Sequence, residues 1–200
     1  MYMNQNRGMP VAVIAESSNQ ISAQIDNEGL VVSDRIEEVM MMCGRSHGIY
    51  EQIGNFAIAL YVLGFLDAED IMAADDIEAD EAADLLTENF AEIKEKDLPL
   101  NYSIKESKER YLLVIGDPLF PLHFAVLTDT QSQRPYFSKL RFFGSGFDRL
   151  QELMSDFLGE DGLGYQDVRY FKKKLYGSKP QELSANIYIV RDDVQQLLVA

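Results

Sequence analysis

The chain has 200 residues, of which 46% are hydrophobic, and a formal net charge of −15 at pH 7. Apolar and aromatic residues run through most of its length, which excludes a wholly disordered chain and permits one large domain or two small ones. The single cysteine, Cys43, excludes a disulfide framework and favours a reducing compartment, so we expect a cytoplasmic protein.

The first apolar segments indicate neither a leader nor a membrane anchor. Residues 11–15 form an apolar run that is too short for a signal-peptide core, and they predict a short strand that pairs with residues 30–32. The longest apolar-rich stretch, residues 53–66, has 14 residues. A membrane span needs about 18 or more, so we expect no membrane partner.

Three helices are predicted in the first half of the chain. The first begins after Asp34, which can cap it together with Glu37, and ends at Gly44. The second covers residues 49–66 and is apolar almost all round, which is typical of the central helix of a bundle. The third covers residues 76–95, with one apolar side and acidic side chains over most of the remainder.

After residue 99 the apolar period changes from 3.6 to 2, which predicts strands. The predicted strands are residues 110–115, 121–128 and 136–143. Their short connections favour an antiparallel meander. The glycines of residues 144–146 should end the third strand, and Ser145 should cap a helix with an apolar stripe from Phe147 to Leu158.

The last part of the chain is less clearly patterned. Residues 168–176 fit either a helix or a strand, residues 186–190 predict a further strand, and residues 192–199 predict a short terminal helix.

We therefore expect an α+β fold, in which a helical acidic N-terminal part is followed by an antiparallel β-meander backed by one or more helices. The division is placed at residue 98: residues 1–98 form a mainly helical acidic region and residues 99–200 a sheet and helix region. The two regions can be separate domains or two layers of one core.

Charge is distributed unevenly along the chain. Residues 1–100 hold 5 Lys/Arg and 20 Asp/Glu, whereas residues 101–200 hold 13 of each. Residues 61–100 alone hold 2 Lys/Arg against 13 Asp/Glu. Such asymmetry is typical of proteins with charged partners.

The acidic face of the third helix is the leading functional candidate. At helical spacing its carboxylates recur about once a turn on one face. The candidate partner-binding residues are Asp80, Glu81, Asp84, Glu88 and Glu92. They can form a solvated face, or a surface that docks a basic partner or imitates nucleic-acid phosphates. Calcium is disfavoured because no EF-hand loop pattern is present. We expect a non-catalytic interaction protein (an inhibitor, adaptor, chaperone or nucleic-acid mimic) that binds a basic protein through residues 67–95.

A basic and aromatic strip over residues 165–179 supports an alternative, nucleic-acid-associated function. Cations interleaved with aromatic rings can hold phosphates and stack bases. The candidate contacts are Arg169, Lys172, Lys173 and Lys174. The same cations can instead form a solvated face or lie against the acidic helix of the chain itself.

Weaker features leave a third alternative, an enzyme with a site near His123 and residues 144–146. His123 stands inside an apolar strand, where a histidine is more often a hydrogen-bonded core or edge residue than a catalyst. A glycine turn before a helix can hold a phosphate or simply connect two elements. Residues 40–43 with His47 offer soft-metal ligands, or a Cys–His pair for catalysis, but fit core packing better. We expect no metal, no cofactor and, on balance, no enzyme.

Overall fold

The structure, a computed structural model, describes residues 29–45, 53–71, 77–140, 143–158 and 162–175. Residues 29–43 form the first helix. The later helices are α2 (Asn55–Val62), α3 (Ala68–Ile71), α4 (Ala79–Asn89) and α5 (Leu150–Ser155), with short 3-10 turns at Glu95–Asp97 and Tyr165–Asp167. The strands are β1 (Phe90–Ile93), β2 (Tyr111–Asp117), β3 (Phe120–Leu127), β4 (Tyr136–Leu140), β5 (Gly144–Asp148) and β6 (Val168–Lys173).

The strands of the described residues form one antiparallel sheet in the order β1-β6-β2-β3-β4-β5. Helices and an antiparallel sheet in one structure confirm the predicted α+β fold. The meander predicted from the spacing of the strands is present as β2, β3 and β4, and β5 extends it by one strand. The last described strand, β6, returns to lie between β1 and β2.

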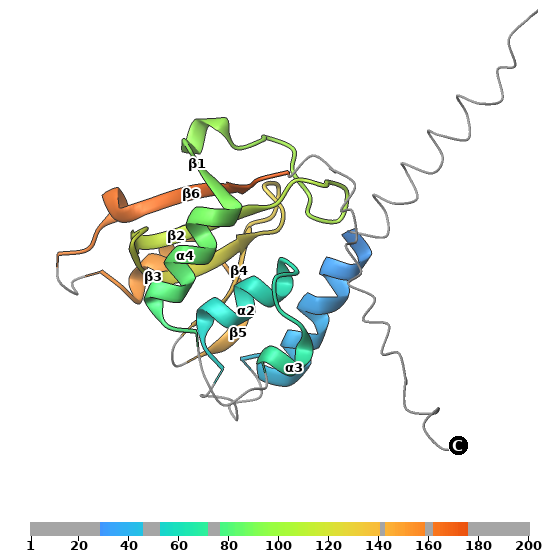
Figure 1. Ribbon diagram of the computed structural model, residues 1–200. Coiled ribbons are helices and arrows are strands. Elements are labelled where there is room, and N and C mark those ends of the chain that lie inside the picture. The colour runs from blue at the N-terminus through green and yellow to red at the C-terminus, as the bar shows by residue number, and fades with distance from the viewer. Residues whose placement is uncertain (1–28, 46–52, 72–76, 141–142, 159–161, 176–200) are drawn as a thin grey trace, which may run out of the picture.

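Helices cover one face of the sheet, where α2 packs on β3 and β4 and α4 packs on β3 (Figure 1). The rings of Phe56 in α2 and Phe124 in β3 meet edge-on, 4.8 Å between centroids. Towards the opposite face, His123 packs on Phe157, which follows α5. Because both faces are covered, the whole run from Tyr111 to Ile115 in β2 is buried.

The first two helices differ in length from the prediction, but their packing agrees with it. The first helix already includes residue 29, so Asp34 lies inside it and is not its cap. Helix α2 begins at Asn55, and residues 49–52 of the predicted range lie outside the described residues. Every residue from Phe56 to Val62 is buried, as expected for a helix that is apolar all round.

The third predicted helix is too long. Helix α4 ends at Asn89, and the backbone of Phe90 is extended (φ −126°, ψ 158°). Phe90 to Ile93 then pair with β6 as strand β1. Residues 90–93 have an apolar spacing that suits a helix, but the neighbouring edge of β6 offers their backbone groups cross-strand partners instead.

The third predicted strand ends earlier than expected, at Leu140, and the prediction that Ser145 caps a helix is wrong. Residues 144–148 form β5, in which Ser145 is buried opposite Lys139 of β4. Phe147 consequently packs on Phe137 across the strand pair, 5.1 Å between ring centroids. The helix starts later, at Leu150, and buries Leu153 and Met154 as its apolar stripe predicts.

Residues 168–173, which fitted either a helix or a strand, form strand β6. The elements predicted at residues 11–15, 186–190 and 192–199 lie outside the described residues. None of the helices in the described part of the chain is long and apolar enough to cross a membrane.

Candidate functional site

Helix α4 presents an acidic surface to solvent. Its inner side buries Ala82, Ala83 and Leu86. The outer side exposes four of the predicted partner-binding residues, Asp80, Glu81, Asp84 and Glu88. Asp80 and Glu81 lie in the first turn, where the positive end of the helix dipole favours carboxylates.

The N-terminal half of the acidic surface has no ion-pair partner in the part of the chain that the structure describes. Within the ranges that the structure describes, no ion pair reaches Asp80, Glu81 or Asp84. The fifth candidate, Glu92, belongs elsewhere because it lies on β1 and not on the helix. Its carboxylate pairs with the guanidinium of Arg169 at 3.3 Å. We therefore define the acidic face as Asp80, Glu81, Asp84 and Glu88.

The four candidate cations of the basic strip lie on or just after β6 and all contact other groups of the chain. Arg169 pairs with Glu92, and Lys172 pairs with Glu109. Lys173 donates to the carbonyl of Leu63 at 3.1 Å and lies over the ring of Phe65. Because side chains alternate along a strand, Arg169 and Lys173 project from one face of the sheet and Lys172 from the other. They do not form one continuous basic surface.

The acidic and basic segments meet at the C-terminal end of α4. The ammonium of Lys174 donates to the carbonyls of Thr87 and Glu88, at 2.8 and 3.0 Å. The last carbonyls of a helix have no partner within the helix and carry partial negative charge, so a cation there is stabilising by about 0.3–1 kcal/mol. Lys174 thus caps α4, while no cation of the described residues pairs with the N-terminal part of the acidic face.

Glu92 and Arg169, one from each predicted site, line the same groove of about 540 Å³, to which β1 and β6 both contribute. Its lining also includes Leu150 and Gln151 of α5 and Tyr165. The groove carries both signs of charge, so it has no strong preference for a cation or an anion.

Cys43 is placed as a core residue. It is 2% exposed, and its thiol shares a hydrogen bond of 3.2 Å with the hydroxyl of Ser145. Burial raises the pKa of this thiol, although Ser145 and Lys139 oppose the effect. A protonated buried thiol is a poor nucleophile and a poor metal ligand. Met40 and Met42 pack against the same core, and His47 lies outside the described residues.

His123 and residues 144–146 are not brought together. His123 lies on β3 and the glycine segment on β5, with β4 between the two strands. The imidazole is 2% exposed, and burial lowers its pKa from 6.5 to about 3. It is therefore neutral at physiological pH, and in the described structure its Nε2 atom has no hydrogen-bond partner.

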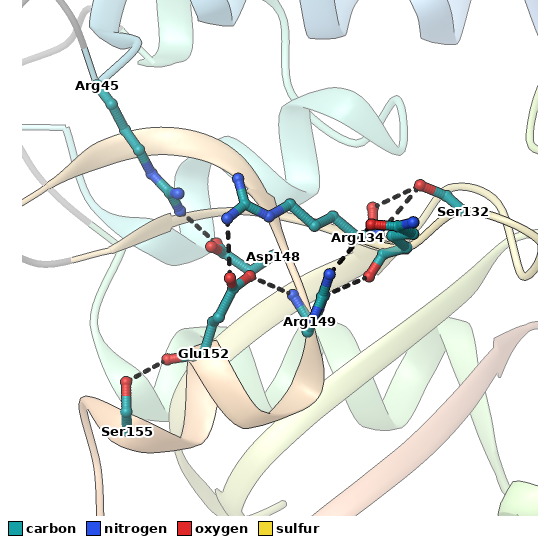
Figure 2. A network of polar contacts seen from close by, with 8 residues as sticks. Arg45, Ser132, Arg134, Asp148, Arg149, Glu152 and Ser155 are labelled. Carbon is teal, nitrogen blue, oxygen red and sulfur yellow. Dashed lines mark hydrogen bonds and ion pairs between the residues drawn. The ribbon is translucent and has the colours of Figure 1, made fainter.

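A polar network joins α5 to the sheet edge (Figure 2). Arg45, which follows the first helix, pairs with the buried carboxylate of Asp148. Glu152 accepts hydrogen bonds from Arg134 at 2.8 Å and from the backbone N–H of Arg149 at 2.9 Å. These bonds tie the β3–β4 loop, β5 and α5 together. The charged groups of the network therefore have a structural role in holding these elements in place.

One pocket was not foreseen from the sequence. It has a volume of about 460 Å³ and lies between the first helix, the C-terminal end of α2, the segment before β2 and the end of β6. Its basic lining residues are Arg35, Lys108, Arg110 and Lys173. They come from three separate parts of the chain, so no local pattern could have grouped them.

Comparisons of the chain with protein-family models, with curated proteins and with solved structures found no match.

Proposed function

We propose that this protein is a non-catalytic interaction protein that docks a basic protein on the acidic face of α4. The observation that carries the proposal is the exposure of Asp80, Glu81 and Asp84 without an ion pair from the described residues. Inhibitor, adaptor, chaperone and nucleic-acid mimic are all modes of action that such a face supports.

The charge pattern of α4 is unfavourable for the isolated helix. Asp80, Asp84 and Glu88 are spaced four residues apart, and like charges at that spacing destabilise a helix by about 0.2–0.5 kcal/mol per pair. Glu88 lies in the last turn, where the helix dipole disfavours a carboxylate. A lysine- or arginine-rich partner would relieve this repulsion, and the relief would add to the binding free energy.

The test neutralises the acidic face in the full-length chain. The variant Asp80→Asn/Asp84→Asn/Glu88→Gln is compared with Asp34→Asn/Glu37→Gln/Glu106→Gln, which removes the same charge from exposed positions elsewhere. Binding of a lysine-rich peptide is measured by calorimetry at low and at physiological ionic strength. We expect the α4 variant to bind about tenfold more weakly or worse and the control to bind nearly as the native chain does.

Affinity capture from host lysate with the same three proteins then identifies the partner. A basic protein that is retained by the native chain and the control, lost with the α4 variant and insensitive to nuclease supports the proposal. Equal binding by all three proteins would contradict it. Capture that disappears with nuclease treatment would favour the nucleic-acid alternative through Arg169 and Lys172 to Lys174.

A further inference from the structure

The basic pocket is charged opposite to the rest of the molecule. The chain has 33 Asp/Glu and 18 Lys/Arg, yet the pocket lining contains four cations and neither Asp nor Glu. Arg110 is only 6% exposed, and its guanidinium donates to the neutral carbonyls of Ser107 and Glu109. Because all the ionisable side chains that line the pocket are cationic, the pocket has an electrostatic preference for an anion.

Two of the pocket cations also cap α2. Arg35 donates to the carbonyl of Tyr61 at 2.7 Å, and Lys173 donates to that of Leu63 at 3.1 Å. A helix C-terminus carries about half a negative charge, so both cations are favourably placed there. Gly64 has φ +81°, and a Cβ atom there would lie 3.1 Å from Arg35 Nη1. A glycine at this position therefore lets the guanidinium approach the helix end.

Lys108 is the cation best placed to meet a ligand. Among the described residues, no hydrogen bond or ion pair holds its ammonium group. The remaining walls are apolar: Val62 and Leu63 are buried at the floor, and Val31 and Leu175 are exposed at the rim. A pocket of about 460 Å³ lies within the size range of small-molecule sites.

We propose that this pocket binds a small amphipathic anion, with its charged head against Lys108 and Arg35 and its apolar body along Val62 and Leu63. The combination of cations with apolar walls excludes two simpler ligand classes. An inorganic anion would leave the apolar walls hydrated, and a neutral apolar molecule would offer no counter-charge to the ammonium of Lys108. The proposal is independent of docking on α4.

The test is a calorimetric titration of the full-length chain with dodecanoate. Dodecyltrimethylammonium has the same tail with the opposite charge, and inorganic phosphate has the charge without the tail. We expect saturable one-to-one binding of dodecanoate, and binding of the other two at least about tenfold weaker. Equal binding of the cationic amphiphile or of phosphate, or no dodecanoate binding, overturns the proposal.

Two pairs of variants locate the site. Lys108→Gln removes one of the four pocket cations, and Lys105→Gln removes an exposed cation of the same segment that does not line the pocket. Val31→Glu places a carboxylate at the rim, and Met41→Glu places one on the same helix at a 70% exposed position. We expect the first member of each pair to weaken dodecanoate binding about tenfold and the second to leave it within about twofold. Binding that is insensitive to Lys108→Gln and Val31→Glu overturns the assignment to this pocket.

Discussion

At the scale of single residues, His123 shows how burial fixes a protonation state. Its ring packs on Phe157, and within the described structure the Nε2 atom lacks a hydrogen-bond partner. The sequence interpretation of His123 as a hydrogen-bonded core or edge residue agrees with its burial but not with the unpartnered Nε2 atom. Burial lowers the pKa of the imidazole to about 3, so the folded protein holds it neutral over most of the pH range.

His123 should make the protein sensitive to mild acid. The unfolded chain takes up a proton on this ring below about pH 6.5, whereas the folded chain does so only near 3. The unfolded state therefore binds more protons in this interval, so the stability that His123 contributes is complete above about pH 6.5 and is lost as the pH falls. Between about pH 7 and about pH 5 we expect a loss on the order of 2 kcal/mol in the free energy of unfolding.

The variant His123→Leu isolates this effect, because leucine is apolar and does not titrate. Urea unfolding at a series of pH values should show a weaker dependence on pH in the variant than in the native chain. If the free energy of unfolding depends on pH equally in the two proteins, His123 does not cause the sensitivity to acid.

At the scale of elements, the close approach of the first helix to β5 decides how the sheet edge is built. Gly44 forms a parallel bridge with Ser145, and the backbone N–H of Arg45 donates to the Ser145 carbonyl at 3.2 Å. Gly144 has φ +71°, and a Cβ atom there would lie 2.7 Å from the Cys43 carbonyl oxygen. The glycine at position 144 is therefore needed so that the first helix can approach β5 this closely. The sequence pattern of residues 144–146 had instead favoured a turn before a helix.

Substitution of two glycines separates backbone strain from the steric clash. Gly144→Ala should destabilise the protein by about 3 kcal/mol, because it adds a clash with backbone to the cost of a positive φ. Gly162 has φ +77°, and a Cβ atom there would meet nothing within 4 Å, so Gly162→Ala should cost only about 1 kcal/mol. Chemical denaturation of both variants measures the loss in free energy of unfolding. Equal losses in the two variants would contradict a steric clash between residue 144 and the Cys43 carbonyl.

At the scale of the whole molecule, the net charge of −15 should oppose compactness. Raising sodium chloride from about 20 to about 200 mM shortens the screening length from about 20 to about 7 Å. We expect the thermal midpoint to rise by a few degrees, because screened self-repulsion outweighs the weakening of exposed pairs such as Arg169–Glu92. The Asp80→Asn/Asp84→Asn/Glu88→Gln protein should show a smaller rise by calorimetry, and a falling midpoint in the native chain would contradict this argument.

The sequence by itself determined the α+β class, the meander and the burial of α2. These follow from side-chain periodicity, which is local: a period of 2 or an apolar run records which faces a segment must bury. Strand pairing is not local, so only the tertiary structure decided that residues 90–93 leave the helix for β6 and that residues 144–148 stay in the sheet.

The same distinction separates the two candidate sites. The acidic face of α4 could be predicted because its carboxylates are neighbours on one helix. The capping of α4 by Lys174 and the pocket around Lys108 depend on contacts between segments far apart in the chain, which chain packing alone creates. Sequence therefore determined where charge is concentrated, and the fold decided which charges are neutralised and which face an open pocket.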